Sequence, residues 1–268
     1  MTGAIIGDIV GSRFEFHNLK SKDFTFFTPD CFFTDDTVMT LAVAKALSKY
    51  KGMRITNHRD FKRVLTDCMH DVGGHYMDCG YGGNFYHWIK ERRTTPYGSY
   101  GNGSAMRVSP AGWYADSLSE AEILAKATAE VTHDHREGIK GAVSVSGAIY
   151  LARTGHSKEE IKRYVSEFYV IDFTLDEIRP VYSFNETCQG SVPQAFAAFF
   201  ESVSFEDAIR NAISIGGDSD TIAAITGSVA EAFYGVDENL KKEAMSYLDE
   251  RLLEIYNNFN KITEVKVK

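Results

Sequence analysis

Apolar residues recur at the spacing of an α-helix along most of this chain, and this periodicity is the strongest constraint on its fold. The run from Thr37 to Tyr50 is one such helix, with apolar residues along one face and Lys45 and Lys49 opposite. The same pattern predicts further helices over Ser119 to Val131, Glu137 to Ala152, Val192 to Glu201, Phe205 to Ser214, Thr221 to Phe233 and Asn239 to Tyr256. Strand-like alternation is nearly absent, since only Asp23 to Phe33 shows it, among loop signals. The sequence therefore predicts an all-α fold.

The chain reads as one domain over residues 1–268. It has only five prolines, no linker rich in Pro, Gly and Ser, and no repeat of solenoid length. Its longest irregular region, Tyr81 to Gly103, is dense in glycine and aromatic residues. A loop of that length in a compact domain is usually functional or mobile.

Composition narrows the class of function. A formal charge of −8 argues against a nucleic-acid surface, and it requires local cations or helix N-termini wherever a phosphate is to bind. The four cysteines include no C-x-x-C pair, so neither a zinc knuckle nor a disulfide framework is indicated. The first residues show neither a basic region nor a long apolar stretch, and no apolar run is long enough to span a bilayer, so we expect neither a signal peptide nor a membrane span. We expect a monomer in the cytoplasm, with no membrane or nucleic-acid partner.

Two acidic clusters stand far apart in the sequence. Thr34-Asp35-Asp36-Thr37 and Asp218-Ser219-Asp220-Thr221 each put two carboxylates and two hydroxyls into four residues before an apolar-periodic run. Hard cations such as Mg²⁺ prefer oxygen ligands, and two such half-sites can share one or two ions. The alternative is ordinary helix capping, which needs only one oxygen. From the residues alone the two interpretations carry about equal weight, and they are compatible.

Two features near the start of the chain are candidates for packing or chemistry. Gly7 and Gly11 are spaced to let two helices approach closely. Glu15, between Phe14 and Phe16, is either a carboxylate in partly apolar surroundings, suited to acid–base catalysis, or an exposed loop acid.

The segment Pro96 to Arg107 alternates glycine with Tyr, Ser and Asn. Its backbone amides, with Ser99, Asn102 and Ser104 as added donors, can bind phosphate, although a plain surface turn explains the composition as well. Tyr97 and Tyr100 offer flat faces for a base or sugar. In Thr132-His133-Asp134-His135, one histidine is a candidate donor to an anionic ligand, while a zinc site is weakly supported because no third ligand is evident.

Taken in order, these segments resemble the ADP-ribosylglycohydrolase family, which includes the dinitrogenase-reductase-activating glycohydrolases and the ADP-ribosyl-acceptor hydrolases. The matching segments are GDIVGSRFE, FTDDTVMTLAVAKAL, CGYGGNFYHW, YGSYGNGSAMRVSPAGW, THDHREGIKGAVSVSGA and SIGGDSDTIAAITGSVAEAFYG, which span residues 3 to about 235. The resemblance implies a compact, orthogonal all-α domain around a binuclear metal site.

The resemblance also implies roles for individual residues. The metal ligands would be Thr34, Asp35, Asp36, Asp218, Asp220 and Thr221, and the catalytic carboxylates Glu15, Asp35 and Asp36. The substrate-binding residues would be Gly82, Gly83, Gly98, Ser99, Tyr100, Gly101, Asn102 and His133. Thr94 falls where some relatives place an adenine-stacking aromatic residue, so Tyr100 or Tyr97 would carry more of that stacking here.

The implied activity is hydrolysis of the N- or O-glycosidic bond between ADP-ribose and an acceptor. The cofactors would be two Mg²⁺ ions, with Mn²⁺ as an alternative, and either Glu15 or a metal-linked aspartate would be the general base. Two other functions stay open: hydrolysis of another ADP-ribosyl compound such as O-acetyl-ADP-ribose, and a module that binds ADP-ribose without turnover. The sequence does not identify the acceptor.

Overall fold

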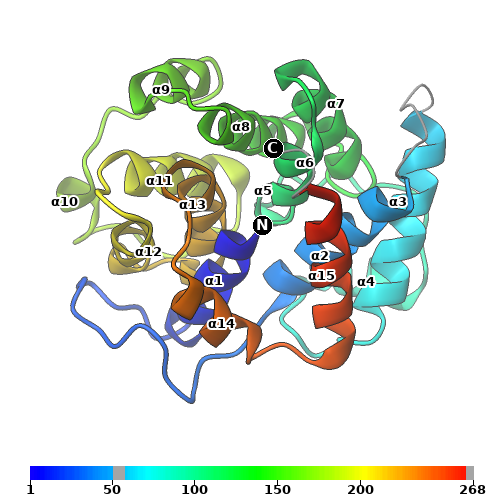
Figure 1. Cartoon of the computed structure of the whole chain (residues 1–268), viewed down its shortest axis with the longest axis horizontal. Helices are drawn as coiled ribbons and strands as arrows, with labels where there is room; N and C mark the ends of the chain where they lie inside the picture. The colour runs from blue at the N-terminus through cyan, green and yellow to red at the C-terminus, as the bar shows by residue number, and fades with distance from the viewer. Residues whose placement is uncertain (51–57, 264–268) are drawn as a thin grey trace.

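The computed structural model describes residues 1–50 and 58–263, and its regular secondary structure is helical (Figure 1). Within these residues no β-strand forms, and a single isolated β-bridge pairs Gly101 with Thr187. None of the helices in the described ranges is both long and apolar enough to cross a membrane. The prediction of an all-α fold is confirmed.

Helix α13 (Ser219–Tyr234) lies at the centre of one half of the molecule. It packs against α1 (Thr2–Gly11), α8 (Arg136–Arg153), α11 (Cys188–Phe200) and α12 (Phe205–Ser214). Every residue of α1 is buried, as are the first twelve residues of α13. Helix α1 and this part of α13 are therefore enclosed by the rest of the protein, as expected of helices with little polar surface.

Helices α1 and α13 cross in direct backbone contact because of glycines. A Cβ atom built on Gly7 would lie 2.1 Å from the carbonyl oxygen of Ala223, and one built on Gly3 would lie 2.1 Å from that of Gly227. Farther along α1, a Cβ on Gly11 would lie 2.5 Å from the Cα of Asp220. The expected close approach at Gly7 and Gly11 is thus observed, and it sets the start of α13 beside the end of α1.

Helix α2 (Asp35–Lys49) organises the other half. It contacts α1, α3 (His58–Gly73), α6 (Ser109–Tyr114) and α15 (Glu250–Thr263), and Figure 1 shows α15 lying across it. The remaining elements are the 3-10 turn Ser12–Phe14, α4 (Gly83–Lys90), α5 (Gly103–Met106), α7 (Leu118–Ala129), α9 (Lys158–Ser166), α10 (Leu175–Ile178) and α14 (Glu238–Met245).

Three of the predicted segments differ from the structure. Helix α11 begins at Cys188 and not at Val192, because the hydroxyl of Thr187 accepts a hydrogen bond from the amide of Gly190 and caps the helix there. The run Asn239 to Tyr256 forms two helices, α14 and α15, because the carboxylate of Asp249 accepts a hydrogen bond from the amide of Leu252 and so begins a new helix. The region Tyr81 to Gly103 is not wholly irregular, since it contains α4. Buried Phe85, Trp88 and Ile89 give that helix an apolar face at the usual spacing.

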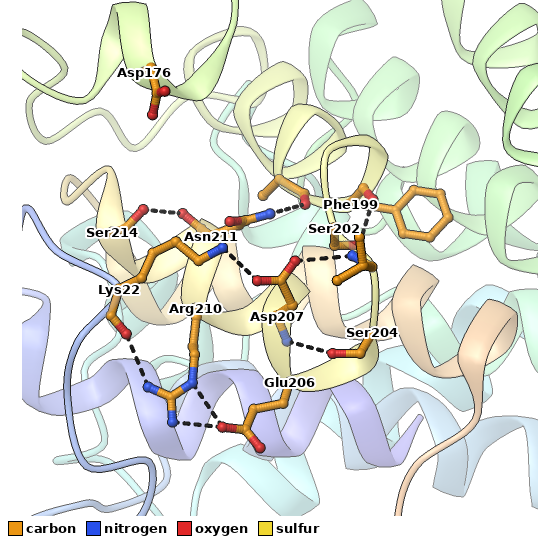
Figure 2. A network of polar contacts seen from close by, with 12 residues as sticks. Lys22, Asp176, Phe199, Ser202, Ser204, Glu206, Asp207, Arg210, Asn211 and Ser214 are labelled. Atoms are coloured by element: carbon orange, nitrogen blue, oxygen red, sulfur yellow. Dashed lines mark hydrogen bonds and ion pairs between the residues drawn. The ribbon is translucent and has the colours of Figure 1, made fainter.

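The strand-like segment Asp23 to Phe33 is a loop rather than a strand. Arg210, on α12, donates to the backbone carbonyl oxygens of Lys22 (3.0 Å) and Phe24 (2.7 Å) and pairs with Glu206, as Figure 2 shows for Lys22 and Glu206. Lys22 also forms an ion pair with Asp207. Arg210 therefore donates the hydrogen bonds that a neighbouring strand would donate in a sheet. These contacts and the ion pair of Lys22 hold the loop against α12.

Candidate functional site

The two acidic clusters meet where α2 and α13 begin. The hydroxyl of Thr221 donates to a carboxylate oxygen of Asp36, 3.0 Å away, although 185 residues separate them. Carboxylate oxygens of Asp8, Asp36 and Asp220 all lie within 4.8 Å of one another. The close crossing of α1 and α13 makes this convergence possible, because Asp8 and Asp220 lie on those helices.

A second group of carboxylates adjoins the first. Oxygen atoms of Glu15, Asp218 and Asp220 also lie within 4.8 Å of one another. Asp218 and Asp220 are buried, whereas Glu15 is half-buried on the loop that follows the 3-10 turn. Asp220 belongs to both groups and links them into one acidic cluster.

Asp8 was not among the predicted site residues. Its two carboxylate oxygens accept hydrogen bonds from the Thr34 amide (2.9 Å), the Thr34 hydroxyl (2.7 Å) and the Thr37 amide (3.0 Å). The side chain is fully buried. An aspartate inside an otherwise apolar segment is the sequence signal that could have identified it, because buried carboxylates need partners.

Helix capping accounts for the first cluster only in part. Thr34 is the N-cap of α2, and its hydroxyl accepts a hydrogen bond from the amide of Asp36. Asp218 stands at the N-cap position of α13 but makes no side-chain cap bond. One carboxylate oxygen of Asp36 is buried with no hydrogen-bond partner among the described residues. The two clusters therefore contain more carboxylates than helix capping requires.

The electrostatics of the cluster favour a bound cation. Burial, followed by repulsion among neighbouring carboxylates, raises the pKa values of Asp35, Asp36 and Asp220 well above their usual range. Burial also raises the pKa of Asp8 to about 6, although the hydrogen bonds from Thr34 and Thr37 act to lower it. For Glu15, burial and then the charges of Asp218 and Asp8 raise the pKa to about 7.

The donor set suits a hard divalent ion. It consists of carboxylate and hydroxyl oxygens, and one oxygen of Asp36 has no hydrogen-bond partner in the part of the chain that the structure describes. Among the described residues, neither of the two carboxylate groups includes a histidine or a cysteine. Oxygen ligands of this kind favour Mg²⁺, Mn²⁺ or Ca²⁺ over softer metals. Thr34 is placed differently from the other predicted ligands, because its hydroxyl donates to Asp8 and it does not line the cavity beside the cluster.

A cavity of about 460 Å³ opens beside the acidic cluster. Its lining includes the acids Glu15, Asp35, Asp36, Asp218 and Asp220, together with residues 97–103. Gly82 and Gly83 also line it, and a Cβ atom built on either would meet no atom within 4 Å. The substrate-binding residues predicted from the sequence thus lie around the same cavity as the acids.

Several polar groups of the glycine-rich loop already have partners within the protein. The amide of Gly98 donates to Asp134 (2.8 Å), that of Gly101 to the hydroxyl of Ser99 (3.1 Å), and that of Asn102 to the carbonyl oxygen of Glu186 (2.8 Å). The hydroxyl of Ser104 donates to the Gly138 carbonyl oxygen. The amides of Ser99 and Tyr100 have no acceptor among the described residues, which leaves these two available to a ligand.

Asn102 contacts the acidic cluster directly. Its side-chain amide donates to Asp218 (2.7 Å) and to the hydroxyl of Ser191 (3.0 Å), and the residue is 7% exposed. Both side-chain protons are therefore bound to protein oxygens. In this structure Asn102 orients a carboxylate, a contact that its place in the glycine-rich run did not indicate.

The two histidines of the Thr132–His135 segment have different surroundings. His135 caps α8 through its Nδ1 atom, which accepts from the amide of Glu137, and its ring packs edge-on against Tyr100. His133 is 5% exposed and lines the cavity beside Gly101 and Gly103. Burial, and then the charge of Arg107, lowers the pKa of His133 well below its usual value, so its imidazole is neutral at pH 7.

Comparison with known sequences identifies the family. The family model described as ADP-ribosylglycohydrolase matches residues 1–265. The chain belongs to the ADP-ribosylglycohydrolase family. The resemblance seen in the ordered motifs is thereby confirmed.

Relatives in this family span most of the chain. ADP-ribosylhydrolase ARH3 of Homo sapiens is 26% identical, with 89% of this chain and 85% of that protein covered. The ADP-ribosyl-dinitrogen-reductase glycohydrolase of Rhodospirillum rubrum is 28% identical, covering 76% of this chain and 70% of the relative. A solved structure described as an ADP-ribosylglycohydrolase-related protein complex superposes with a TM-score of 0.69 at 21% identity, over 97% of this chain and 95% of its own. That likeness supports the ADP-ribosylglycohydrolase fold.

Proposed function

We propose that this protein hydrolyses the N- or O-glycosidic bond that joins ADP-ribose to an acceptor, and so reverses ADP-ribosylation. One observation carries the proposal: an acidic cluster and a glycine-rich loop with a buried histidine line the same cavity. A ligand that carries both a sugar and a diphosphate matches that lining. Family membership and the printed names of the relatives support the same reaction.

The proposed cofactor is a pair of Mg²⁺ ions, with Mn²⁺ as an alternative. We add Asp8 to the ligands expected from the sequence, because its carboxylate lies in one group with those of Asp36 and Asp220, and Asp218 lies in the adjoining group. Asp35 and Thr221 line the cavity beside these groups, whereas Thr34 would act through its hydrogen bond to Asp8. When bound, such ions supply Lewis acidity toward hydroxyl and water oxygens. Burial and mutual repulsion disfavour the charged form of these carboxylates, and bound ions would offset that cost by neutralising them.

The other residues of the cavity would bind and orient the substrate. Gly82 and Gly83 leave the space that a ribose ring would fill. The amides of Ser99 and Tyr100, with His133, would donate to the diphosphate. Tyr100 is 49% exposed at the rim and offers its ring face to adenine.

Glu15 is the carboxylate that we assign as general base. It lies on the cavity wall beside Asp218 and Asp220, and it is half-buried whereas those two are enclosed. A carboxylate in that position can take a proton from a water molecule whose oxygen bonds to the anomeric carbon while the bond from that carbon to the acceptor breaks. The acceptor leaves with the electron pair of the broken bond and takes up a proton.

A panel of substrates tests the proposal. Arginine-, serine- and nucleobase-linked ADP-ribose, together with O-acetyl-ADP-ribose, are each incubated with the protein in Mg²⁺ or in EDTA, and free ADP-ribose is measured by chromatography. We expect release from at least one substrate in Mg²⁺ and none in EDTA. Failure to cleave any of them would count against the proposal, and calorimetric binding of ADP-ribose without turnover would favour a binding module instead.

A further inference from the structure

Arg107 is a buried cation on the wall of the acidic cavity. It lies between α5 and α6, is 1% exposed, and is the only lysine or arginine among the described residues that line the cavity. No carboxylate of the described residues forms an ion pair with it. Burying a charge without an ionic partner costs free energy. The presence of this buried guanidinium with only uncharged hydrogen-bond partners therefore calls for an explanation.

Those contacts lead to His133. The Nη2 atom of Arg107 donates to the carbonyl oxygen of Thr128 (2.9 Å) and to the hydroxyl of Thr132 (2.8 Å). The same hydroxyl lies 2.7 Å from Nδ1 of His133. Arg107, Thr132 and His133 thus form a chain of hydrogen bonds, which we call the Arg–Thr–His chain.

Counting protons fixes the direction of this chain. A guanidinium can only donate, so the Thr132 oxygen accepts from Arg107. The single hydroxyl proton of Thr132 then needs an acceptor, because the residue is fully buried. Nδ1 of His133 is the acceptor in hydrogen-bond range among the described residues. Nδ1 therefore carries no proton.

This assignment determines what His133 presents to the cavity. A neutral imidazole without a proton on Nδ1 carries it on Nε2. The Nε2 atom faces the glycine-rich loop, since a Cβ atom built on Gly103 would lie 3.1 Å from it and one built on Gly101 would lie 3.5 Å from it. His133 therefore turns a hydrogen-bond donor toward the loop that lines the cavity.

We propose that Arg107 is a positioning residue, which acts through Thr132 to hold His133 as the tautomer that donates from Nε2 to an anionic group of the ligand. The inference rests on the proposed function, because the anionic group is the diphosphate of ADP-ribose. Reversal of the tautomer would put a lone pair, instead of a proton, opposite a phosphate oxygen. The Arg–Thr–His chain therefore selects for an anion at this part of the cavity.

Nitrogen NMR tests the assignment without substrate. In histidine labelled with ¹⁵N, long-range proton–nitrogen correlations distinguish a protonated ring nitrogen from an unprotonated one. The spectrum of a His133→Gln variant identifies the signals of His133 among the eight histidines. We expect a proton on Nε2 and none on Nδ1 in the wild-type protein, and the opposite pattern overturns the inference.

Thr132→Val removes the hydroxyl at nearly constant volume. It should shift the His133 signals toward a mixture of tautomers and weaken ADP-ribose binding about tenfold, the effect of losing one hydrogen bond. Thr132→Ser restores the hydroxyl and should restore both readouts. Unchanged His133 signals in the valine variant would overturn the chain.

Thr128→Val is the matched control. Thr128 is also fully buried, and its hydroxyl donates to Ala125 (2.8 Å) within its own helix. The substitution keeps the backbone carbonyl oxygen that accepts from Arg107, so it removes a buried hydroxyl without removing a contact of the Arg–Thr–His chain. The control should lose a comparable amount of stability and leave the His133 signals unchanged. If wild-type protein fails to bind ADP-ribose at all, the proposed function is wrong, whereas the NMR spectra still decide the tautomer separately.

Discussion

The hydroxyl of Thr221 donates to the carboxylate of Asp36 across the junction of α13 and α2, at 3.0 Å. This hydrogen bond joins the two acidic clusters, and it forms only because α1 and α13 cross in backbone contact beside α2. The helix packing that forms the core therefore also brings the acidic cluster together. A substitution that disturbs this packing should change metal binding, and a substitution in the cluster should change the stability of the fold.

Replacement of Asp220 tests the cluster most directly, because this residue belongs to both groups of carboxylates. Asp220→Asn should reduce Mg²⁺-dependent release of ADP-ribose by more than about 100-fold, since loss of a ligand should exceed the effect of losing an outer-shell partner. Calorimetry should show weaker Mg²⁺ binding. In EDTA the variant should be at least as stable as wild type, because one repelling charge is gone.

Asp176→Asn is the control for charge. Asp176 is exposed on α10, pairs with Arg179, and lies away from the cavity. It should leave Mg²⁺ binding and turnover unchanged. Near-normal turnover by Asp220→Asn would refute a metal site built from both clusters.

Stabilisation by Mg²⁺ should increase with pH. Burial raises the pKa of Asp8 from 3.8 to about 6, and burial with neighbouring charges raises that of Glu15 from 4.5 to about 7. Raised carboxylate pKa values contribute stability to the metal-free fold below about pH 4, and this contribution is lost as pH rises toward 7. A cation favours the charged forms, so it competes with protons at pH 5 and binds freely at pH 8.

Thermal unfolding in Mg²⁺ and in EDTA measures this difference. At a concentration 100 times the dissociation constant, binding should add about 2.7 kcal/mol at pH 8 and much less at pH 5. Taking the difference between the two conditions cancels the titration of groups outside the site. An equal Mg²⁺ effect at both pH values would contradict the ligand assignment.

Local patterns predicted several of the longer helices, such as α2, α8 and α12, but not α3 or α9. Contacts between residues far apart in the sequence decided features of the site that local patterns did not reveal. Phe205 to Ser214 matches α12 at both ends, because its apolar spacing and its serine cap are contained in one short segment. The role of Asp8 depends on Thr34 and Thr37, 26 and 29 residues later. Asn102 has its partner Asp218 at a separation of 116 residues, and no local pattern encodes that contact.

Gly7→Ala should damage both packing and metal binding. The added methyl group would lie 2.1 Å from the Ala223 carbonyl oxygen, which is backbone and cannot turn aside. We expect a loss of about 3 kcal/mol in the free energy of unfolding, at the upper end for overpacking. Mg²⁺ affinity should fall as well, because α1 carries Asp8. Gly83→Ala, where a Cβ meets open space, should cost little stability in the same denaturant titration.

Asn102→Ala separates two roles for that residue. Since its amide donates to Asp218, we expect Mg²⁺ affinity to fall by about 10- to 100-fold, as for other groups that orient a metal ligand. Ser191→Ala removes its other partner and should have a smaller effect. Unaltered Mg²⁺ affinity with weaker ADP-ribose binding would instead mean that Asn102 contacts the diphosphate.

Tyr100 should contribute to binding through its ring face and not through its hydroxyl. The side chain is 49% exposed at the cavity rim and is held edge-on by His135. Tyr100→Ala should weaken ADP-ribose binding by about 1–3 kcal/mol, the usual contribution of stacking one base on an aromatic ring. Tyr100→Phe should retain wild-type affinity. Ribose 5-phosphate lacks adenine and should bind the wild-type protein and both variants equally. Weaker binding of ribose 5-phosphate by Tyr100→Ala would show that the substitution had disturbed the loop itself.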